Sequence, residues 1–373
     1  MTPGPTRVPE RVLRAGARTM IHHRDSEFSK LLVATLEGLR PLFGTTGDVL
    51  PIHATGRGAM EASIGNLLSP GDEVIACTNG RFGEMWARVA ESFGLVVHRL
   101  STAWGPADEH AFADALETHP KSRATLLVHS ETSTGVLNDV RVLARAARRR
   151  ELLVMVDCVS SLGGATVSLD EWDVDVAVTA SQKCLMSSPG MSFVALSERA
   201  WRANKTAGLP RSYFDFAAIR RALARARPET PGTAPVHLFC QVNEALKIIH
   251  EEGLENVFAR HENMGRMVRD WGKSYGFSLQ HPSAQSFTPT LTALRVPEGF
   301  NAETIREGLK RRGILTARGL GEYEGKCIRI GHMGDIKPTD VRQMLTVLSE
   351  VIGTQNHGGQ NHQREDSRGK VAK

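Results

Sequence analysis

Several features that mark particular protein classes are scarce or absent in this sequence. Only five cysteines occur among the 373 residues, with no C-x-x-C pair, and no histidine cluster has zinc-ligand spacing. A disulfide scaffold or a structural metal site is therefore not expected. No apolar run reaches membrane-spanning length, and residues 1–6 lack the basic and apolar regions of a secretory signal. We therefore expect a cytoplasmic protein without a membrane segment and without a metal.

Strong charge of one sign is also lacking, since the formal net charge is only +5 at pH 7. Basic residues gather at residues 145–150 and again at Arg220, Arg221 and Arg225. The first group lies on the polar side of a helical pattern, so a solvated helix face explains it. No aromatic-rich RNA motif or helix-turn-helix pattern accompanies either group, and nucleic-acid binding is the weaker alternative.

Hydrophobic residues make up 41% of the chain, enough for a large buried core. Between residues 25 and 200, helical patterns alternate with short apolar runs. Helices are predicted at 28–39, 59–68, 82–93, 111–118 and 140–149, and strands at 73–76, 95–98, 124–128, 152–156 and 174–178. Apolar runs without polar alternation are typical of strands buried on both faces. The pattern therefore predicts an α/β domain with a large, mostly parallel sheet.

The remaining sequence predicts a smaller C-terminal α+β domain. The predicted elements are helices at 236–252 and 254–275, strand 290–296, helix 302–312, strand 327–330 and helix 339–351. Residues from 353 onward are polar and poor in apolar side chains, which is typical of a disordered tail. We therefore predict three parts: an N-terminal arm and large domain at 1–252, the small domain at 253–352, and the tail at 353–373.

Two side chains with potential chemistry follow buried strands of the large domain, where the ligands of doubly wound sheets gather. Asp157 follows the strand at 152–156, and a carboxylate there would keep the pyridine nitrogen of a cofactor protonated. A helix cap is the simpler alternative. Lys183 follows the strand at 174–178 among small residues, where shielding from water would lower its pKa and favour a Schiff base. A solvated surface lysine is the plainer alternative.

Two loops add to this pattern. Residues 54–58 (ATGRG) precede a helix, and glycines there let backbone N–H groups bind a phosphate, although a turn alone would explain them. Residues 129–135 (HSETSTG) form a hydroxyl-rich turn after the strand at 124–128, with capping of the next helix as the alternative. Glycine loop, hydroxyl turn, acid and lysine therefore follow successive strands of one sheet in a fixed order.

This order resembles the fold-type I pyridoxal-phosphate enzymes, and within them the class V aminotransferases of the alanine-, serine- and ureidoglycine–glyoxylate branch. The resemblance runs from residue 2 to residue 331. Its most specific segments are 79–83 (NGRFG), 129–136 (HSETSTGV), 157–163 (DCVSSLG), 181–185 (SQKCL) and 329–334 (RIGHMG). It implies pyridoxal 5'-phosphate as the cofactor and a homodimer with active sites shared at the subunit interface.

The resemblance also implies roles for individual residues. Lys183 would form the Schiff base and then act as the base that moves a proton on the substrate, while Asp157 would pair with the pyridine nitrogen. Arg329 would bind the substrate carboxylate through its two-pronged guanidinium, unless it is an exposed strand arginine. The other residues would hold the cofactor: Phe82 and Val159 on the ring faces, Thr132 at the phenolic oxygen, Thr55, Gly56, Arg57 and Gln182 at the phosphate, and Thr230 and Thr233 at the phosphate from a second subunit. Ordinary core packing is the alternative for Phe82.

Some positions depart from relatives of this branch. Arg57 stands where some members have a histidine, and residues 229–233 (ETPGT) differ from the versions in other branches. Residues 22–25 (HHRD) lack the glutamine expected in a ureidoglycine enzyme, and His22 and His23 either face the substrate or are structural. The resemblance therefore implies transfer from a small amino acid, alanine or serine first, to a 2-oxo acid such as glyoxylate. Because donor choice depends on pocket shape, aspartate stays open as a donor.

Two other functions remain as alternatives. A lyase or cysteine desulfurase of the same class usually has a histidine immediately before the lysine, where this chain has Gln182. Such an enzyme also needs a cysteine on a mobile loop, whereas Cys327 lies in a predicted strand two residues before Arg329. A non-catalytic fold relative with a binding role is disfavoured, because Lys183, Asp157 and Arg329 are all present.

Overall fold

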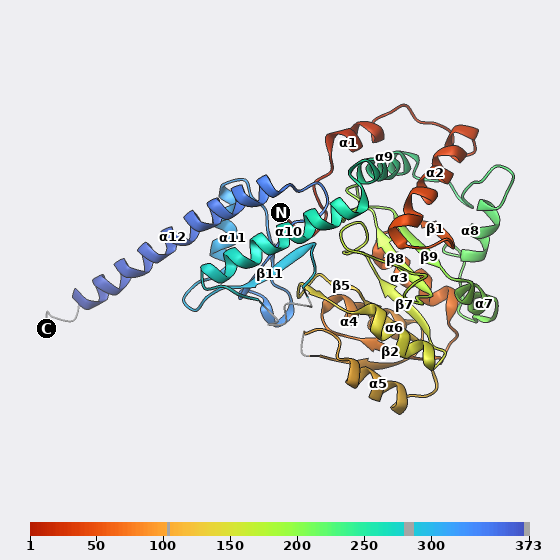
Figure 1. The fold of residues 1–373 in the computed structure, drawn as a ribbon, viewed down its shortest axis with the longest axis horizontal. Coiled ribbons are helices and arrows are strands. Elements are labelled where there is room, and N and C mark those ends of the chain that lie inside the picture. Colours follow the sequence, from red (N-terminus) through yellow and green to blue (C-terminus); the bar gives the residue numbers. More distant parts are fainter. Residues whose placement is uncertain (103–104, 280–286, 369–373) are drawn as a thin grey trace.

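The computed structural model describes residues 1–102, 105–279 and 287–368, with side chains described as far as residue 353. A seven-stranded sheet forms the centre of the larger part (Figure 1). Its strands are β1 (Asp48–Ile52), β2 (Glu73–Cys77), β3 (Val96–Leu100), β4 (Ser122–Val128), β7 (Leu153–Asp157), β8 (Val176–Ala180) and β9 (Ser192–Leu196). They lie in the order β1-β9-β8-β7-β4-β2-β3, and β9 alone runs antiparallel to both of its neighbours. The sheet is therefore mostly parallel, as predicted.

Helices cover both faces of this sheet. One face packs against α2 (Ser26–Phe43), α5 (Glu109–Thr118), α6 (Val140–Arg149) and α9 (Val236–Glu252), with α1 (Glu10–Gly16) lying on α9. The other face packs against α3 (Gly56–Leu67), α4 (Arg81–Ser92), α7 (Glu198–Thr206) and α8 (Phe216–Leu223). Along β7, Val154 and Val156 point into the first core and Leu153 and Met155 into the second. Burial on both faces explains why these strands read as continuous apolar runs.

A smaller antiparallel sheet follows, with strand order β10-β11-β13-β12. Its strands are β10 (Ser278–Leu279), β11 (Leu291–Arg295), β12 (Ala317–Arg318) and β13 (Cys327–Gly331). The helices α10 (Leu254–Ser274), α11 (Ala302–Arg311) and α12 (Pro338–Arg368) pack on it around a separate core that includes Leu294, Ile328 and Leu348 (Figure 1). Gly253, with φ +85°, lies between α9 and α10, where the sequence predicts the boundary after residue 252.

Most predicted elements are confirmed with ends shifted by a few residues, whereas several others, among them β1, β9, α1, α7 and α8, were not predicted. The sequence of β1, DVLPI, contains Pro51, and β1 forms an edge of the sheet, where a missing N–H is tolerated. Among the described helices, none contains a stretch that is both long and apolar enough to cross a membrane.

The disordered tail from residue 353 stays a prediction, and helix α12 is assigned beyond that residue. Helix α12 continues to Arg368, and residues 369–373 lie outside the described residues. Extending an existing helix adds one backbone hydrogen bond per residue without a new nucleation step. Polar residues can therefore continue a helix that begins on the small core, even though their composition alone is typical of disorder.

Candidate active site

The predicted acid and lysine lie at the carboxyl edge of the large sheet. Asp157 is the last residue of β7, and Lys183 lies in the turn after β8. A cavity of about 270 Å³ opens at this edge. Eight of the predicted cofactor residues line it: Thr55, Gly56, Arg57, Phe82, Asp157, Val159, Gln182 and Lys183. The fold therefore brings together side chains that are up to 128 positions apart in the sequence (183 minus 55).

The Lys183 side chain is held by the N-terminal arm. Its Nζ donates a hydrogen bond of 2.5 Å to the carbonyl oxygen of Pro3. Burial lowers the pKa of Lys183 to about 8, while the nearby Asp157 carboxylate acts in the opposite direction. A lysine with this pKa has a substantial fraction of neutral amine near neutral pH, and the neutral amine is the nucleophilic form.

The arm crosses the lysine at a position where only glycine fits. Gly4 has φ +131°, and a Cβ added to it would lie 2.6 Å from the Lys183 Nζ. Thr6 fastens the arm, because its N–H donates to the Gln182 carbonyl at 3.0 Å and its Oγ1 donates to the Lys183 carbonyl at 2.9 Å. Sequence reasoning assigned no role to Pro3, Gly4 or Thr6.

The lowered pKa of Lys183 predicts selective chemical reactivity in the cofactor-free protein. A small acylating reagent should modify Lys183 with a rate that rises through about pH 8. Lys247 and Lys310, whose side chains are exposed, serve as comparison sites. Mass spectrometry of digested samples across a pH series measures each rate. A modification rate at Lys183 that does not rise through about pH 8 would contradict the argument from burial.

Asp157 is a buried carboxylate, with 4% of its surface exposed. Burial raises its pKa to about 7, partly offset by a 2.7 Å hydrogen bond from the Val159 N–H to Oδ1. The buried Glu131 carboxylate raises the pKa of Asp157 further, and the Lys183 ammonium lowers it. A positively charged N–H donor in the cavity would therefore be strongly favoured beside Asp157, because it would restore the ionised carboxylate.

The N-terminus of α3 forms another wall of the cavity. Thr55 is the N-cap residue, and its side chain makes no capping hydrogen bond. Gly56 packs so closely on Val159 that an added Cβ would lie 2.6 Å from Val159 Cγ2. Uncapped N–H groups and the helix dipole favour an anion at such a helix end. Arg57, also in the cavity lining, adds a positive charge.

Arg329 and Thr132 lie in a connected polar cluster but are not among the residues that line the cavity. The Arg329 Nη1 donates to the Thr132 carbonyl at 2.9 Å, and its Nε donates to the Arg318 carbonyl at 2.8 Å. Burial lowers the pKa of Arg329 to about 10, so the guanidinium stays charged at neutral pH. The Thr132 hydroxyl shares a 2.6 Å hydrogen bond with the Ser160 hydroxyl.

Two predicted phosphate residues lie outside this cavity in the single chain. Thr230 and Thr233 belong to the segment between α8 and α9 and are not part of the cavity lining. Thr230 is buried and donates a 2.7 Å hydrogen bond to the Gly232 carbonyl, whereas Thr233 is exposed. Within one chain, the structure does not bring them to Lys183.

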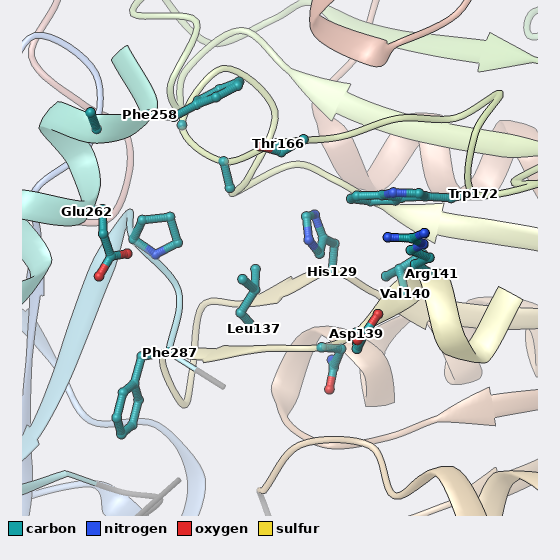
Figure 2. A pocket seen from close by; sticks show the side chains of 15 residues that line it. His129, Leu137, Asp139, Val140, Arg141, Thr166, Trp172, Phe258, Glu262 and Phe287 are labelled. Carbon is teal, nitrogen blue, oxygen red and sulfur yellow. The ribbon is translucent and has the colours of Figure 1, made fainter. Parts of the chain in front are cut away.

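A separate hollow of about 510 Å³ lies between loops of the large sheet and α10 (Figure 2). His129 lies in its wall, with Nδ1 3.0 Å from the Ser161 hydroxyl and the ring edge-on to Trp172 at 5.3 Å. Burial lowers the pKa of His129 to about 4, so its imidazole is neutral. Neither Lys183 nor Asp157 lines this hollow. We therefore assign the chemistry to the smaller cavity, because it contains both Lys183 and Asp157.

A mostly parallel α/β sheet with a lysine, a carboxylate and a helix N-terminus around one cavity defines a fold-type I pyridoxal-phosphate enzyme. Residues 3–323 match the family described as Aminotransferase class-V, and the chain belongs to this family. It is therefore a pyridoxal-phosphate-dependent aminotransferase. In the part of the chain that the structure describes, no group of three or more His, Cys, Asp or Glu side chains is placed to bind a metal ion.

Similar proteins carry several names. The chain is 40% identical over 357 residues to the "Soluble hydrogenase, small subunit" of Synechococcus sp. (strain PCC 6716), covering 94% of this chain and 92% of that one. It is 39% identical over 341 residues to the L-aspartate–glyoxylate aminotransferase of Paracoccus denitrificans, covering 90% and 86%. The solved alanine–glyoxylate aminotransferase of a Nostoc species superposes with a TM-score of 0.89 at 32% identity, covering 94% of both chains.

The residues of the cavity fit pyridoxal phosphate. The uncapped N-terminus of α3 and Arg57 suit its phosphate group, and the buried Asp157 suits its pyridine nitrogen. The carboxamide oxygen of Gln182 is buried without a hydrogen-bond partner among the described residues, so a hydrogen-bond donor on a ligand would satisfy it. A lysine with a lowered pKa lies in the same cavity, and its amine is the group that would attach the aldehyde of the cofactor.

Proposed function

We propose that this aminotransferase moves an amino group from a small amino acid to glyoxylate or a similar 2-oxo acid, with Lys183 as its catalytic base. The observation that carries the proposal is the shared cavity of Lys183, Asp157 and the α3 N-terminus. The acceptor is supported by the names of the Paracoccus and Nostoc relatives, both of which are glyoxylate aminotransferases.

In the proposed mechanism, bound pyridoxal phosphate supplies an electron sink that makes the Cα proton of the substrate acidic. The neutral Nζ of Lys183 removes this proton and returns it during amino transfer. Asp157 holds a proton at the pyridine nitrogen, because its buried carboxylate is stabilised by a positive N–H partner. Arg329 binds the substrate carboxylate through the guanidinium N–H groups that do not donate to the Thr132 and Arg318 carbonyls.

We further propose how the remaining residues hold the cofactor. Phe82 and Val159 contact the two faces of the ring, and Thr132 hydrogen-bonds the phenolic oxygen. The phosphate is bound at Thr55, Gly56, Arg57 and Gln182, with Thr230 and Thr233 contributed by the second subunit of a homodimer. The position of Thr230 and Thr233 outside the cavity of their own chain supports their action across an interface. The compartment proposed for this enzyme is the cytoplasm.

A half-reaction screen tests the proposed function. The purified holoenzyme is mixed with single amino acids in the absence of an acceptor, and the absorbance band of the bound cofactor is followed. Loss of the band with alanine, serine or aspartate, and its return on adding glyoxylate, is the expected result. A protein that takes up no cofactor, or a band that no donor changes, would overturn the proposal.

Alanine and serine are the first candidates for the donor, and one structural feature favours aspartate as a second candidate. A cavity of about 460 Å³ shares Arg57 and Met85 with the lysine cavity and is also lined by Arg81 and Arg88. Among the described residues, Arg88 pairs with Glu84, while no ion pair involves Arg57 or Arg81. An unpaired arginine beside the substrate site is suited to the second carboxylate of a dicarboxylic donor.

Replacement of Arg81 by methionine tests the aspartate alternative. If Arg81 binds the distal carboxylate, kcat/KM for aspartate should fall about 10- to 100-fold, the loss expected for a hydrogen bond to a charged group. The value for alanine should stay within about threefold, because alanine has no second carboxylate. Arg88→Met is the matched control in the same cavity, since Glu84 already pairs with that arginine. Equal losses for aspartate and alanine in the Arg81 variant would exclude this role.

A further inference from the structure

The turn after β4 contains a buried carboxylate that the mechanism above does not use. Glu131, in the short strand β5 (Ser130–Glu131), is fully buried. Its Oε2 accepts hydrogen bonds from the N–H groups of Phe82 at 3.0 Å and Gly83 at 3.1 Å. Its Oε1 accepts from the Ser133 N–H at 2.9 Å and the Ser133 hydroxyl at 2.6 Å. Burial raises the pKa of Glu131, and these four donors oppose that rise because they require both oxygens to be acceptors.

These bonds fix the start of α4. Phe82 and Gly83 are in the first turn of that helix, whose N–H groups have no partner within the helix. A carboxylate at this end satisfies two of them and interacts favourably with the helix dipole. The approach is close, because a Cβ added to Gly80 would lie 2.4 Å from Glu131 Cγ. Glu131 therefore sets the position of α4, and with it that of Phe82 in the wall of the lysine cavity.

The same turn also holds the residues on the substrate side. The Ser133 hydroxyl accepts a 2.9 Å hydrogen bond from the Arg81 N–H, and the neighbouring Thr132 carbonyl accepts from the Arg329 guanidinium. The Glu131 carboxylate thus ties the start of α4 to the turn that contacts Arg329. Loss of its charge would loosen Phe82 relative to Asp157 and Lys183, which are held by strands of the large sheet.

We propose that Glu131 is a positioning residue that holds Phe82 against the cofactor ring. This inference rests on the proposed cofactor site and extends it, because Glu131 itself does not line the cavity. It acts on the cofactor only through α4 and the 131–133 turn. The consequence is that cofactor affinity depends on a carboxylate that contacts neither the cofactor nor the substrate.

Glu131→Gln in the full-length protein tests the proposal by titration with pyridoxal phosphate. Glutamine has nearly the same shape, but an NH₂ group replaces one of the two carboxylate oxygens. This NH₂ group is itself a donor, so it cannot accept the N–H or O–H hydrogen bonds that the lost oxygen accepted. The Kd for the cofactor should rise about 10- to 100-fold, in line with the loss of hydrogen bonds to a charged group. The circular dichroism of the cofactor band should also change, because Phe82 would no longer hold the ring in one orientation. Glu84→Gln is the matched control. Glu84 is a carboxylate in the first turn of the same helix, and it accepts hydrogen bonds from Arg88 and Arg99. This variant should leave the Kd for the cofactor and the circular dichroism of its band unchanged.

A double-mutant cycle separates positioning through Phe82 from a general loss of stability. If Glu131 acts through Phe82, Glu131→Gln should add little to the rise in Kd caused by Phe82→Leu. Fully additive effects, or an unchanged Kd in the Glu131 variant, would overturn the proposal. If Glu131→Gln fails to fold, Ser133→Ala takes its place, because it removes the hydroxyl that donates to Glu131. A raised Kd for the cofactor in this variant supports the positioning role, and an unchanged Kd overturns it. Failure of the wild-type protein to bind the cofactor would instead refute the proposed function.

Discussion

Lys183→Ala should lower the rate of amino transfer about 10⁴-fold or more, the upper end of what a positioned general base contributes. The variant loses both the amine that attaches the cofactor and the base that moves the Cα proton. Alanine has no amine to move this proton, and Pro3, the hydrogen-bond partner of the Lys183 amine, offers only a carbonyl oxygen. Single-turnover absorbance changes with a donor amino acid measure the effect.

Two controls make this result specific. Lys247→Ala removes a lysine with an exposed side chain and should leave the rate unchanged. Thermal unfolding of the Lys183 variant should show an intact fold, since removing a buried amine with a lowered pKa relieves a desolvation cost. Turnover of the Lys183 variant close to that of the wild type would refute the mechanism.

Asp157→Asn should lower kcat by about 10²- to 10³-fold, the size of effect seen when one electrostatic partner in an active site is removed. The amide is nearly isosteric with the carboxylate but carries no charge, so it cannot keep the pyridine nitrogen protonated. Binding of the cofactor phosphate involves other residues and should be affected less. The measurements are kcat and the Kd for pyridoxal phosphate, and an unchanged kcat would contradict the role of Asp157.

Asp157 also predicts a pH dependence of stability in the cofactor-free protein. Its pKa is about 7 in the folded state and near 3.9 in an unfolded chain. Between these values the folded state binds more protons than the unfolded one, so the contribution of Asp157 to stability decreases as pH rises from about 4 to about 7. The full effect is on the order of 4 kcal/mol. Denaturant unfolding gives the free energy of unfolding of the wild type and of Asp157→Asn at each pH in this range. The difference between the two free energies should be small near pH 4 and should grow toward pH 7. A difference that does not change with pH would contradict the prediction.

The catalytic edge of the sheet could be predicted from the sequence because its signals are local. Asp157 and Lys183 each follow an apolar run, and strands of that kind are buried on both faces in an α/β sheet. Parallel strands end at the same edge, so residues after successive strands converge. Asp157 and Lys183 follow from this geometry and the 54–58 loop from its place before a helix, whereas Phe82, Val159 and Gln182 were implied only by the resemblance; all eight positions line one cavity. The roles of Thr230 and Thr233 concern a second subunit and stay predictions.

Other parts of the site depend on contacts between distant segments, which carry no local signal. The hydrogen bond from Lys183 to Pro3 joins residues 180 positions apart. Glu131 reads as one polar residue in a hydroxyl-rich turn, and only the packing of α4 onto that turn reveals its hydrogen bonds from the Phe82 and Gly83 N–H groups. The tail after residue 353 stays a prediction, since composition describes an isolated segment and not one that continues an existing helix.

Peptide mapping after borohydride reduction tests the central claim most directly. The holoenzyme is reduced, digested and analysed by mass spectrometry for the peptide that carries the reduced cofactor. Our account predicts a single labelled site at Lys183, the lysine of the cavity with a lowered pKa. Labelling should disappear in Lys183→Ala and persist in Lys247→Ala. Label on another lysine, with Lys183 unmodified, would contradict the assignment of the active site.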